Sequence, residues 1–144
     1  MPSQSLRLGI AGLGTVGVGV LRILRKQAVL LEKRTGSTLT ISAVSARDRS
    51  KDRGVSLSDC GWEDDPVALA KREDVDVFVE LMGGADGAAK AAVEAALNAG
   101  KDVVTANKAM LALHGQALAE RAEAAGRVLR SEERRVGKEC RSRW

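Results

Sequence analysis

Residues 9–17 read Gly-Ile-Ala-Gly-Leu-Gly-Thr-Val-Gly, an apolar run that ends in three glycines spaced G-x-G-x-x-G. This spacing is typical of the turn between a strand and a helix that binds a dinucleotide. Gly12 would let the chain turn sharply, Gly14 would let the backbone approach a pyrophosphate, and Gly17 would let the helix pack closely on its strand. The helix start would then offer free N–H groups and a partial positive charge to the phosphates.

The residues on either side of the glycines support this interpretation. Residues 6–11 have the pattern of a buried strand, and apolar residues recur at helical spacing over residues 15–33. The phosphate-binding loop of nucleoside triphosphatases does not fit, because no Lys-Ser or Lys-Thr follows the second glycine. The sequence therefore favours a dinucleotide, with an ordinary strand-to-helix turn as the alternative.

Strand and helix patterns alternate along the rest of the chain. This alternation predicts an α/β fold with a doubly wound parallel sheet, a Rossmann NAD(P)-binding fold that is incomplete at the C-terminus. The expected strand order is 3-2-1-4-5, which places the strands over residues 6–11 and 101–105 side by side, and residues 55–64 read as a loop. The other predicted elements are strands over 39–44 and 75–81, a strand that starts at 127–129, and helices over 67–71, 87–99 and 116–125.

A charged run follows the second predicted strand, where a dinucleotide fold places the residue that selects between NAD and NADP. An acidic side chain there accepts a hydrogen bond from the 2′-hydroxyl of NAD, whereas a basic one accommodates the 2′-phosphate of NADP. Arg47 is nearest the strand end, with Arg49 and Lys51 beyond it, while Asp48 would serve the opposite preference. We therefore favour NADP over NAD, with a solvated charged loop as the alternative.

Two further segments are predicted to end at the same edge of the sheet. Gly83 lies in the Met-Gly-Gly sequence that ends the third predicted strand, where the backbone could again come close to a ligand. Thr105, Asn107 and Lys108 follow the fourth and could hold the nicotinamide end of a cofactor and attract an anionic substrate. A capped helix start with a surface lysine is the alternative. His114, the only histidine, is expected in a turn and is assigned no role.

Charge and composition exclude several classes of function. Of the formal net charge of +4, +3 lies in residues 130–144, so the rest of the chain carries no electrostatic footprint for nucleic acid. No apolar run approaches the roughly 20 residues that span a bilayer, and the N-terminus has no secretory pattern. Cys60 and Cys140 suggest neither a zinc site nor a disulfide framework. We expect a cytoplasmic protein without a metal, a membrane or a nucleic-acid partner.

Three segments together resemble the N-terminal part of homoserine dehydrogenases. They are the glycine turn, Glu-Leu-Met-Gly-Gly at residues 80–84 and Thr-Ala-Asn-Lys at residues 105–108, and the likeness covers about residues 5–130. The resemblance implies interconversion of L-homoserine and L-aspartate 4-semialdehyde with NAD or NADP, in threonine and methionine biosynthesis. It assigns Leu13, Thr15, Val16 and Gly17 to the pyrophosphate, Arg47 to the adenosine ribose, and Thr105 and Lys108 to the nicotinamide and substrate side.

The last residues of the chain depart from the family pattern. Residues 130–144 resemble a translated sequencing-library adapter, with a natural basic tail as the alternative. We expect a dinucleotide-binding domain over residues 1–130 and a foreign, disordered tail over residues 131–144. The family's catalytic residues would lie in a domain that these residues lack, so none is assigned and the chain is expected to be inactive alone. The full-length protein is expected to be a homo-oligomer. A nucleotide-sensing module without chemistry and another nicotinamide-dependent dehydrogenase are the alternatives.

Overall fold

Six parallel strands form one sheet in the computed structural model, which describes residues 4–131. The sheet has the order β3-β2-β1-β4-β5-β6, and each neighbouring pair is parallel. This arrangement confirms the predicted α/β fold with a doubly wound parallel sheet. The strands are β1 (Gln4–Ala11), β2 (Ser37–Ser45), β3 (Gly61–Glu63), β4 (Val77–Glu80), β5 (Asp102–Thr105) and β6 (Leu129–Ser131).

The predicted assignment of strands within that order is wrong by one position. Residues 61–63, expected in a loop, form the edge strand β3 beside β2. The strand that lies next to β1 is therefore β4, and β5 is one place further out. The expectation that residues 6–11 and 101–105 are neighbours is thus wrong. The short strand β3, which has no sequence pattern, takes the edge position expected for residues 75–81, and these residues lie beside β1 instead. The crossover from β3 to β4 makes the β1–β4 boundary the point where the winding reverses.

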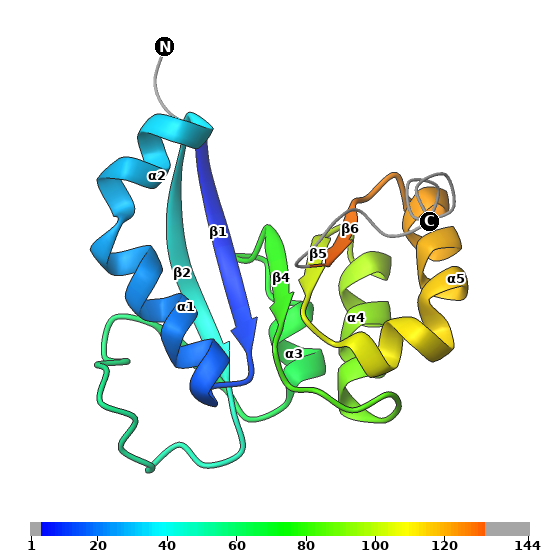
Figure 1. Ribbon diagram of the computed structural model, residues 1–144, viewed down its shortest axis with the longest axis horizontal. Helices are drawn as coiled ribbons and strands as arrows, with labels where there is room; N and C mark the ends of the chain where they lie inside the picture. The colour runs from blue at the N-terminus through cyan, green and yellow to red at the C-terminus, as the bar shows by residue number, and fades with distance from the viewer. Residues whose placement is uncertain (1–3, 132–144) are drawn as a thin grey trace.

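Five helices connect the strands: α1 (Thr15–Lys26), α2 (Ala28–Thr35), α3 (Pro66–Ala70), α4 (Ala88–Asn98) and α5 (Lys108–Ala125). Figure 1 shows α1 and α2 on one side of the sheet and α3, α4 and α5 on the other. The single helix predicted over residues 15–33 is two helices, with Gln27 between them. The helix predicted over residues 116–125 begins much earlier, because Asn107 caps it by accepting a hydrogen bond from the Met110 amide at 3.0 Å.

Each face of the sheet has its own apolar core. Under α1, the side chains of Ile10, Leu21 and Val44 are fully buried. On the opposite face, Phe78 packs in a cluster with the small residues of α4, whose alanines allow the helix to approach the sheet closely. These two cores hold the strands rigidly, so the loops at the carboxyl ends of β1, β2 and β4 are presented from a fixed frame. Among the described residues, no helix is long and apolar enough to cross a membrane.

Candidate functional site

The glycine turn after β1 leaves no room for side chains at two of its three glycines. Gly12 has a φ of +104°, and a Cβ there would lie 2.6 Å from the carbonyl oxygen of Leu81. A Cβ on Gly17 would overlap the carbonyl oxygen of Gly12, so the close approach expected of Gly17 is to the turn itself. At Gly14, by contrast, a Cβ would meet no atom within 4 Å. Gly14 therefore borders open space in which a ligand can approach the backbone.

Helix α1 begins directly at this turn. Gly14 is its N-cap residue and has no side chain that could satisfy the first amides of the helix. The first turn contains no acidic residue, so the partial positive charge of the helix start is not neutralised there. Thr15 and Val16 form this first turn on the surface, and the Val16 side chain is 58% exposed. The geometry suits an anionic group placed against the helix start.

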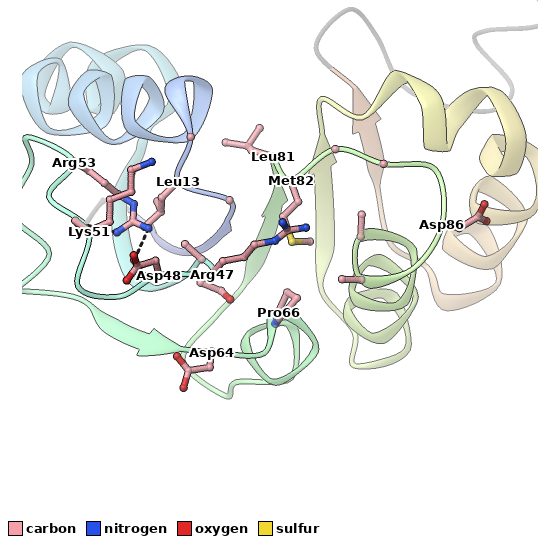
Figure 2. A pocket seen from close by; sticks show the side chains of 18 residues that line it. Leu13, Arg47, Asp48, Lys51, Arg53, Asp64, Pro66, Leu81, Met82 and Asp86 are labelled. Atoms are coloured by element: carbon pink, nitrogen blue, oxygen red, sulfur yellow. Dashed lines mark hydrogen bonds between the residues drawn. The ribbon is translucent and has the colours of Figure 1, made fainter.

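A cavity of about 640 Å³ lies at the carboxyl edge of the sheet, between the loops that follow β1, β2 and β4 (Figure 2). It brings together five of the residues predicted to bind cofactor, namely Gly12, Leu13, Gly14, Arg47 and Gly83. The remaining five predicted residues lie outside its lining; they are Thr15, Val16, Gly17, Thr105 and Lys108. The first three continue the glycine turn into α1, and the last two follow β5.

The wall of the cavity that follows β2 is basic. Arg47, Lys51 and Arg53 all line it. Among the described residues, the Arg47 guanidinium has no hydrogen-bond or ion-pair partner, and in Figure 2 its side chain extends across the cavity. Arg53 is held in place, since it donates to the backbone oxygens of Asp48 at 2.6 Å and Lys51 at 3.1 Å. This wall therefore combines fixed and movable positive charges, which suit a phosphate group.

The Asp48 carboxylate faces the same wall but is engaged by its own loop. Its Oδ1 accepts hydrogen bonds from the Ser50 hydroxyl at 2.7 Å and the Ser50 amide at 3.0 Å. These bonds, together with nearby positive charge, lower the pKa of Asp48 below its ordinary value. The group that would select NAD by accepting a ribose hydroxyl is thus already partly satisfied within the loop.

Two further carboxylates line the cavity and were not predicted as site residues. Asp64 accepts a hydrogen bond from the Trp62 indole at 2.7 Å, and Asp86 lies 2.6 Å from the His114 imidazole. The expectation that His114 lies in a turn is wrong, because it belongs to α5 and pairs with a residue 28 positions earlier. No local pattern signals this pairing, since only the packing of α5 brings the two side chains together.

Thr105, at the end of β5, is buried and its hydroxyl is used within the protein. It donates a hydrogen bond to Glu80 Oε1 at 2.5 Å and accepts one from the Asn107 amide at 3.0 Å. Lys108 is the first residue of α5 and is exposed. Glu80 belongs to the segment that carries the family resemblance but was assigned no role; it is completely buried, and its carboxylate accepts the amides of Met82 and Gly83 in the cavity wall. A charged residue at the end of an otherwise apolar strand, three residues before a Gly-Gly pair, is the signal that could have drawn attention to it.

Known proteins resemble this arrangement in both sequence and structure. The family described as homoserine dehydrogenase, NAD binding domain, matches residues 12–132. This chain belongs to the homoserine dehydrogenase family. The homoserine dehydrogenase of Corynebacterium glutamicum is 41% identical over 124 residues, which are 86% of this chain and 27% of that protein. The Bacillus subtilis enzyme is 35% identical over 85% of this chain and 28% of its own length.

Solved homoserine dehydrogenase structures share the fold of this family member. The S. aureus enzyme at pH 8.5 has a TM-score of 0.81 and 32% identity, covering 90% of this chain and 32% of that one. The Thiobacillus denitrificans enzyme has a TM-score of 0.83 and 31% identity, covering 90% and 30%. This chain therefore spans between about a quarter and a third of the length of these relatives. Three features of this chain agree with the cofactor-binding role of this domain in the family: the glycine turn, the open space at Gly14 and the uncapped start of α1.

Metal binding finds no support in the part of the chain that the structure describes. No group of three or more histidine, cysteine, aspartate or glutamate side chains there could hold a metal ion. The predicted tail over residues 131–144 lies outside the described residues, except for Ser131. That residue is the last of β6, so the strand predicted to start at residues 127–129 begins at Leu129 and continues into the segment that resembles an adapter.

Proposed function

We propose that this chain is the cofactor-binding part of an enzyme that interconverts L-homoserine and L-aspartate 4-semialdehyde with a nicotinamide dinucleotide. The observation that carries the proposal is the open space at Gly14, at the start of an uncapped helix and on the floor of a cavity at the sheet's winding reversal. Membership of the homoserine dehydrogenase family supplies the substrate class. When bound, the dinucleotide would accept or donate the hydride.

NADP is the cofactor that the cavity favours. Arg47, Lys51 and Arg53 line the β2 side, where the adenosine ribose of a dinucleotide is held in this fold. A 2′-phosphate placed there would meet guanidinium groups, which pair with phosphate through two parallel hydrogen bonds. The Asp48 carboxylate, which would favour NAD, is partly engaged, because its Oδ1 accepts both the hydroxyl and the amide of Ser50. The proposed site would therefore select NADP over NAD, because its basic side chains attract the 2′-phosphate and its carboxylate is partly engaged within the loop.

The residues of this chain would bind and orient the cofactor, whereas groups outside the described residues would bind the substrate and accept its proton. Hydride transfer also requires a proton acceptor within hydrogen-bond reach of the substrate hydroxyl. Each carboxylate that lines the described cavity already has a partner, namely Ser50 for Asp48, Trp62 for Asp64 and His114 for Asp86. We expect the 144-residue chain to bind NADP⁺ without oxidising homoserine.

Calorimetric titration of the chain with NADP⁺ and NAD⁺ tests the binding half of this proposal. A Gly14→Val variant should lose affinity for both, because its side chain would fill the space open to the pyrophosphate. Gly19→Ala is the matched control, since a Cβ there also meets nothing within 4 Å but lies along α1, away from the cavity. Unchanged affinity in Gly14→Val would contradict the assignment of the glycine turn.

A chimaera tests the enzymatic half. Residues 1–130 of this chain would replace the corresponding segment of the C. glutamicum homoserine dehydrogenase, and homoserine-dependent reduction of NADP⁺ would be measured. If the chimaera is active and the Gly14→Val substitution abolishes this activity, this domain binds the cofactor that the reaction uses. A folded chimaera that binds NADP⁺ and never turns over would favour a nucleotide-sensing module instead.

A further inference from the structure

One carboxylate outside the cavity joins the two loops that follow β4 and β5. Glu80 is 0% exposed and lies at the end of β4, where it pairs across the sheet with Thr105 at the end of β5. Its Oε1 accepts the Thr105 hydroxyl at 2.5 Å. Its Oε2 accepts two backbone amides, those of Met82 at 2.8 Å and Gly83 at 3.2 Å. Breaking the hydrogen bonds of a buried carboxylate costs much free energy, because the negative charge is then left without partners.

These bonds fix what the loop over residues 82–84 can offer to a ligand. Met82, Gly83 and Gly84 line the cavity, and glycines with positive φ occur at the latter two positions. Such loops commonly bind anions through successive backbone amides. Here the amides of Met82 and Gly83 are directed at Glu80, so they are not available to a phosphate. Two of the three amides of this cavity wall are therefore not available to an anion.

A second contact completes the connection between the loops. The Asn107 side chain donates to the Gly84 carbonyl at 2.6 Å, while its own Oδ1 caps α5. Thr105 in turn accepts the Asn107 amide. The wall formed by residues 82–84 is thus held at both of its ends by β5 and the start of α5. A displacement of the Glu80 carboxylate would loosen the whole wall.

The position of this wall indicates which part of a dinucleotide it faces. In a doubly wound sheet the two mononucleotide halves lie on opposite sides of the winding reversal, with the adenosine on the β2 side. Arg47 marks the β2 side of the cavity, and residues 82–84 form the opposite, β4 side. The wall therefore faces the nicotinamide half, whose ribose hydroxyls and carboxamide are hydrogen-bond donors.

We infer that Glu80 is a positioning residue for the nicotinamide half of the cofactor. By binding the amides of Met82 and Gly83, it removes two donors that could have held a phosphate and fixes the position of the β4 wall that faces the nicotinamide half. Glu80 itself is buried and touches no ligand. This inference rests on the proposed function, because it requires a nicotinamide dinucleotide in the cavity.

The test compares two ligands that share the adenosine half. The 144-residue chain and its Glu80→Gln variant are titrated with NADP⁺ and with adenosine 2′,5′-bisphosphate, which lacks the nicotinamide half. The amide of glutamine cannot accept all three donors, so NADP⁺ affinity should fall about tenfold or more, as expected when bonds to a charged acceptor are lost. Affinity for adenosine 2′,5′-bisphosphate should stay unchanged.

Matched variants separate positioning from a general loss of stability. Lys101→Met removes a buried ammonium that donates to the carbonyls of Arg72 and Val75, just before the opposite end of β5. It should lower the melting temperature but leave both affinities unchanged. If Glu80→Gln does not fold, Thr105→Val removes one donor to the carboxylate and should show the same split between ligands. Thr105→Ser keeps the hydroxyl and should restore NADP⁺ binding.

The outcomes distinguish this inference from the proposed function. Equal weakening of both ligands, or no weakening of NADP⁺, would overturn the role of Glu80 while the cofactor site stood. If the unmodified chain bound adenosine 2′,5′-bisphosphate and NADP⁺ with no gain from the nicotinamide half, the β4 wall would have no part in recognition. Failure of the unmodified chain to bind either ligand would overturn the proposed function and this inference together.

Discussion

The carbonyl oxygen of Gly12 occupies the place that a Cβ on Gly17 would take. The two residues lie at opposite ends of the glycine turn, one after β1 and the other in the first turn of α1. Gly12 has a φ of +104°, a backbone conformation that residues with a side chain rarely adopt. One glycine sets the direction of a carbonyl and the other provides the space for it, so the pair fixes how α1 leaves the sheet.

Gly17→Ala and Gly14→Ala should therefore have different effects, although both add one methyl group to the same turn. At Gly17 the methyl would overlap backbone, and we expect a loss of roughly 1–3 kcal/mol in the free energy of unfolding. At Gly14 the methyl meets nothing and the φ of −77° is ordinary for any residue, so the loss should be smaller, about 0.5–1 kcal/mol for alanine in place of an N-cap glycine. Urea denaturation measures both. Equal destabilisation would contradict this account of the turn.

Arg47→Ala should weaken NADP⁺ more than NAD⁺. Only NADP⁺ carries the 2′-phosphate that a guanidinium on the β2 wall could pair with. We expect a loss of about tenfold or more for NADP⁺, the size of one hydrogen bond to a charged group, and little change for NAD⁺. Arg121→Ala is the control, because Arg121 pairs with Glu94 and Asn98, outside the cavity. Equal losses for the two cofactors would remove Arg47 from the selecting role.

Ser50→Ala should shift the preference of the site toward NAD⁺. The Ser50 hydroxyl donates to Asp48 Oδ1, and alanine keeps only the backbone amide bond. Because those bonds lower the pKa of Asp48, removing the hydroxyl should raise that pKa toward its ordinary value and free the carboxylate to accept a ribose hydroxyl. The ratio of the two dissociation constants measures the shift. A ratio identical to that of the unmodified chain would show that Asp48 does not face the cofactor.

The glycine turn could be predicted from sequence because its signal is local. Three glycines follow an apolar strand and precede a helical pattern, so the whole signal lies within residues 6–33. β3 could not be predicted in the same way. It contains only Gly61, Trp62 and Glu63, which have no periodicity, and it is held by its pairing with residues 43–45 of β2. Missing this strand placed residues 101–105 beside β1 and residues 75–81 at the sheet edge, whereas the pairing of the last two strands was expected correctly.

The hydrogen-bond partners of the predicted site residues also could not be predicted from the sequence. Thr105 was expected to face the nicotinamide, yet its hydroxyl is buried against Glu80, 25 positions away. The pairing depends on β4 and β5 being neighbours, which the expected strand order denied. Arg47 lines the cavity, and its position depends on where β2 ends, which the sequence pattern indicates locally. Its role toward NADP stays a prediction.

Acid should destabilise the fold partly through Asp76, which precedes β4. Hydrogen bonds from the Arg7 side chain hold the pKa of Asp76 below its ordinary value of 3.8, and the Arg7 amide donates to the same carboxylate at 2.9 Å. A lowered pKa in the folded state means that the carboxylate contributes stability above about pH 4, which is lost as the pH falls further. Asp76→Asn should lower the free energy of unfolding at pH 7 by about 1 kcal/mol, since the pair is partly exposed.

The difference in free energy of unfolding between Asp76→Asn and the unmodified chain should shrink when urea denaturation is repeated below pH 3.8. The carboxylate becomes protonated there in the unfolded state and, at still lower pH, in the folded state. Asp59→Asn is the matched control. Asp59 also pairs with an arginine, Arg25 at 3.0 Å, but its side chain is 73% exposed, so its removal should change stability little at any pH. A difference between Asp76→Asn and the unmodified chain that stays constant from pH 7 to pH 3 would show that Arg7 stabilises β1 and β4 without the charge of Asp76.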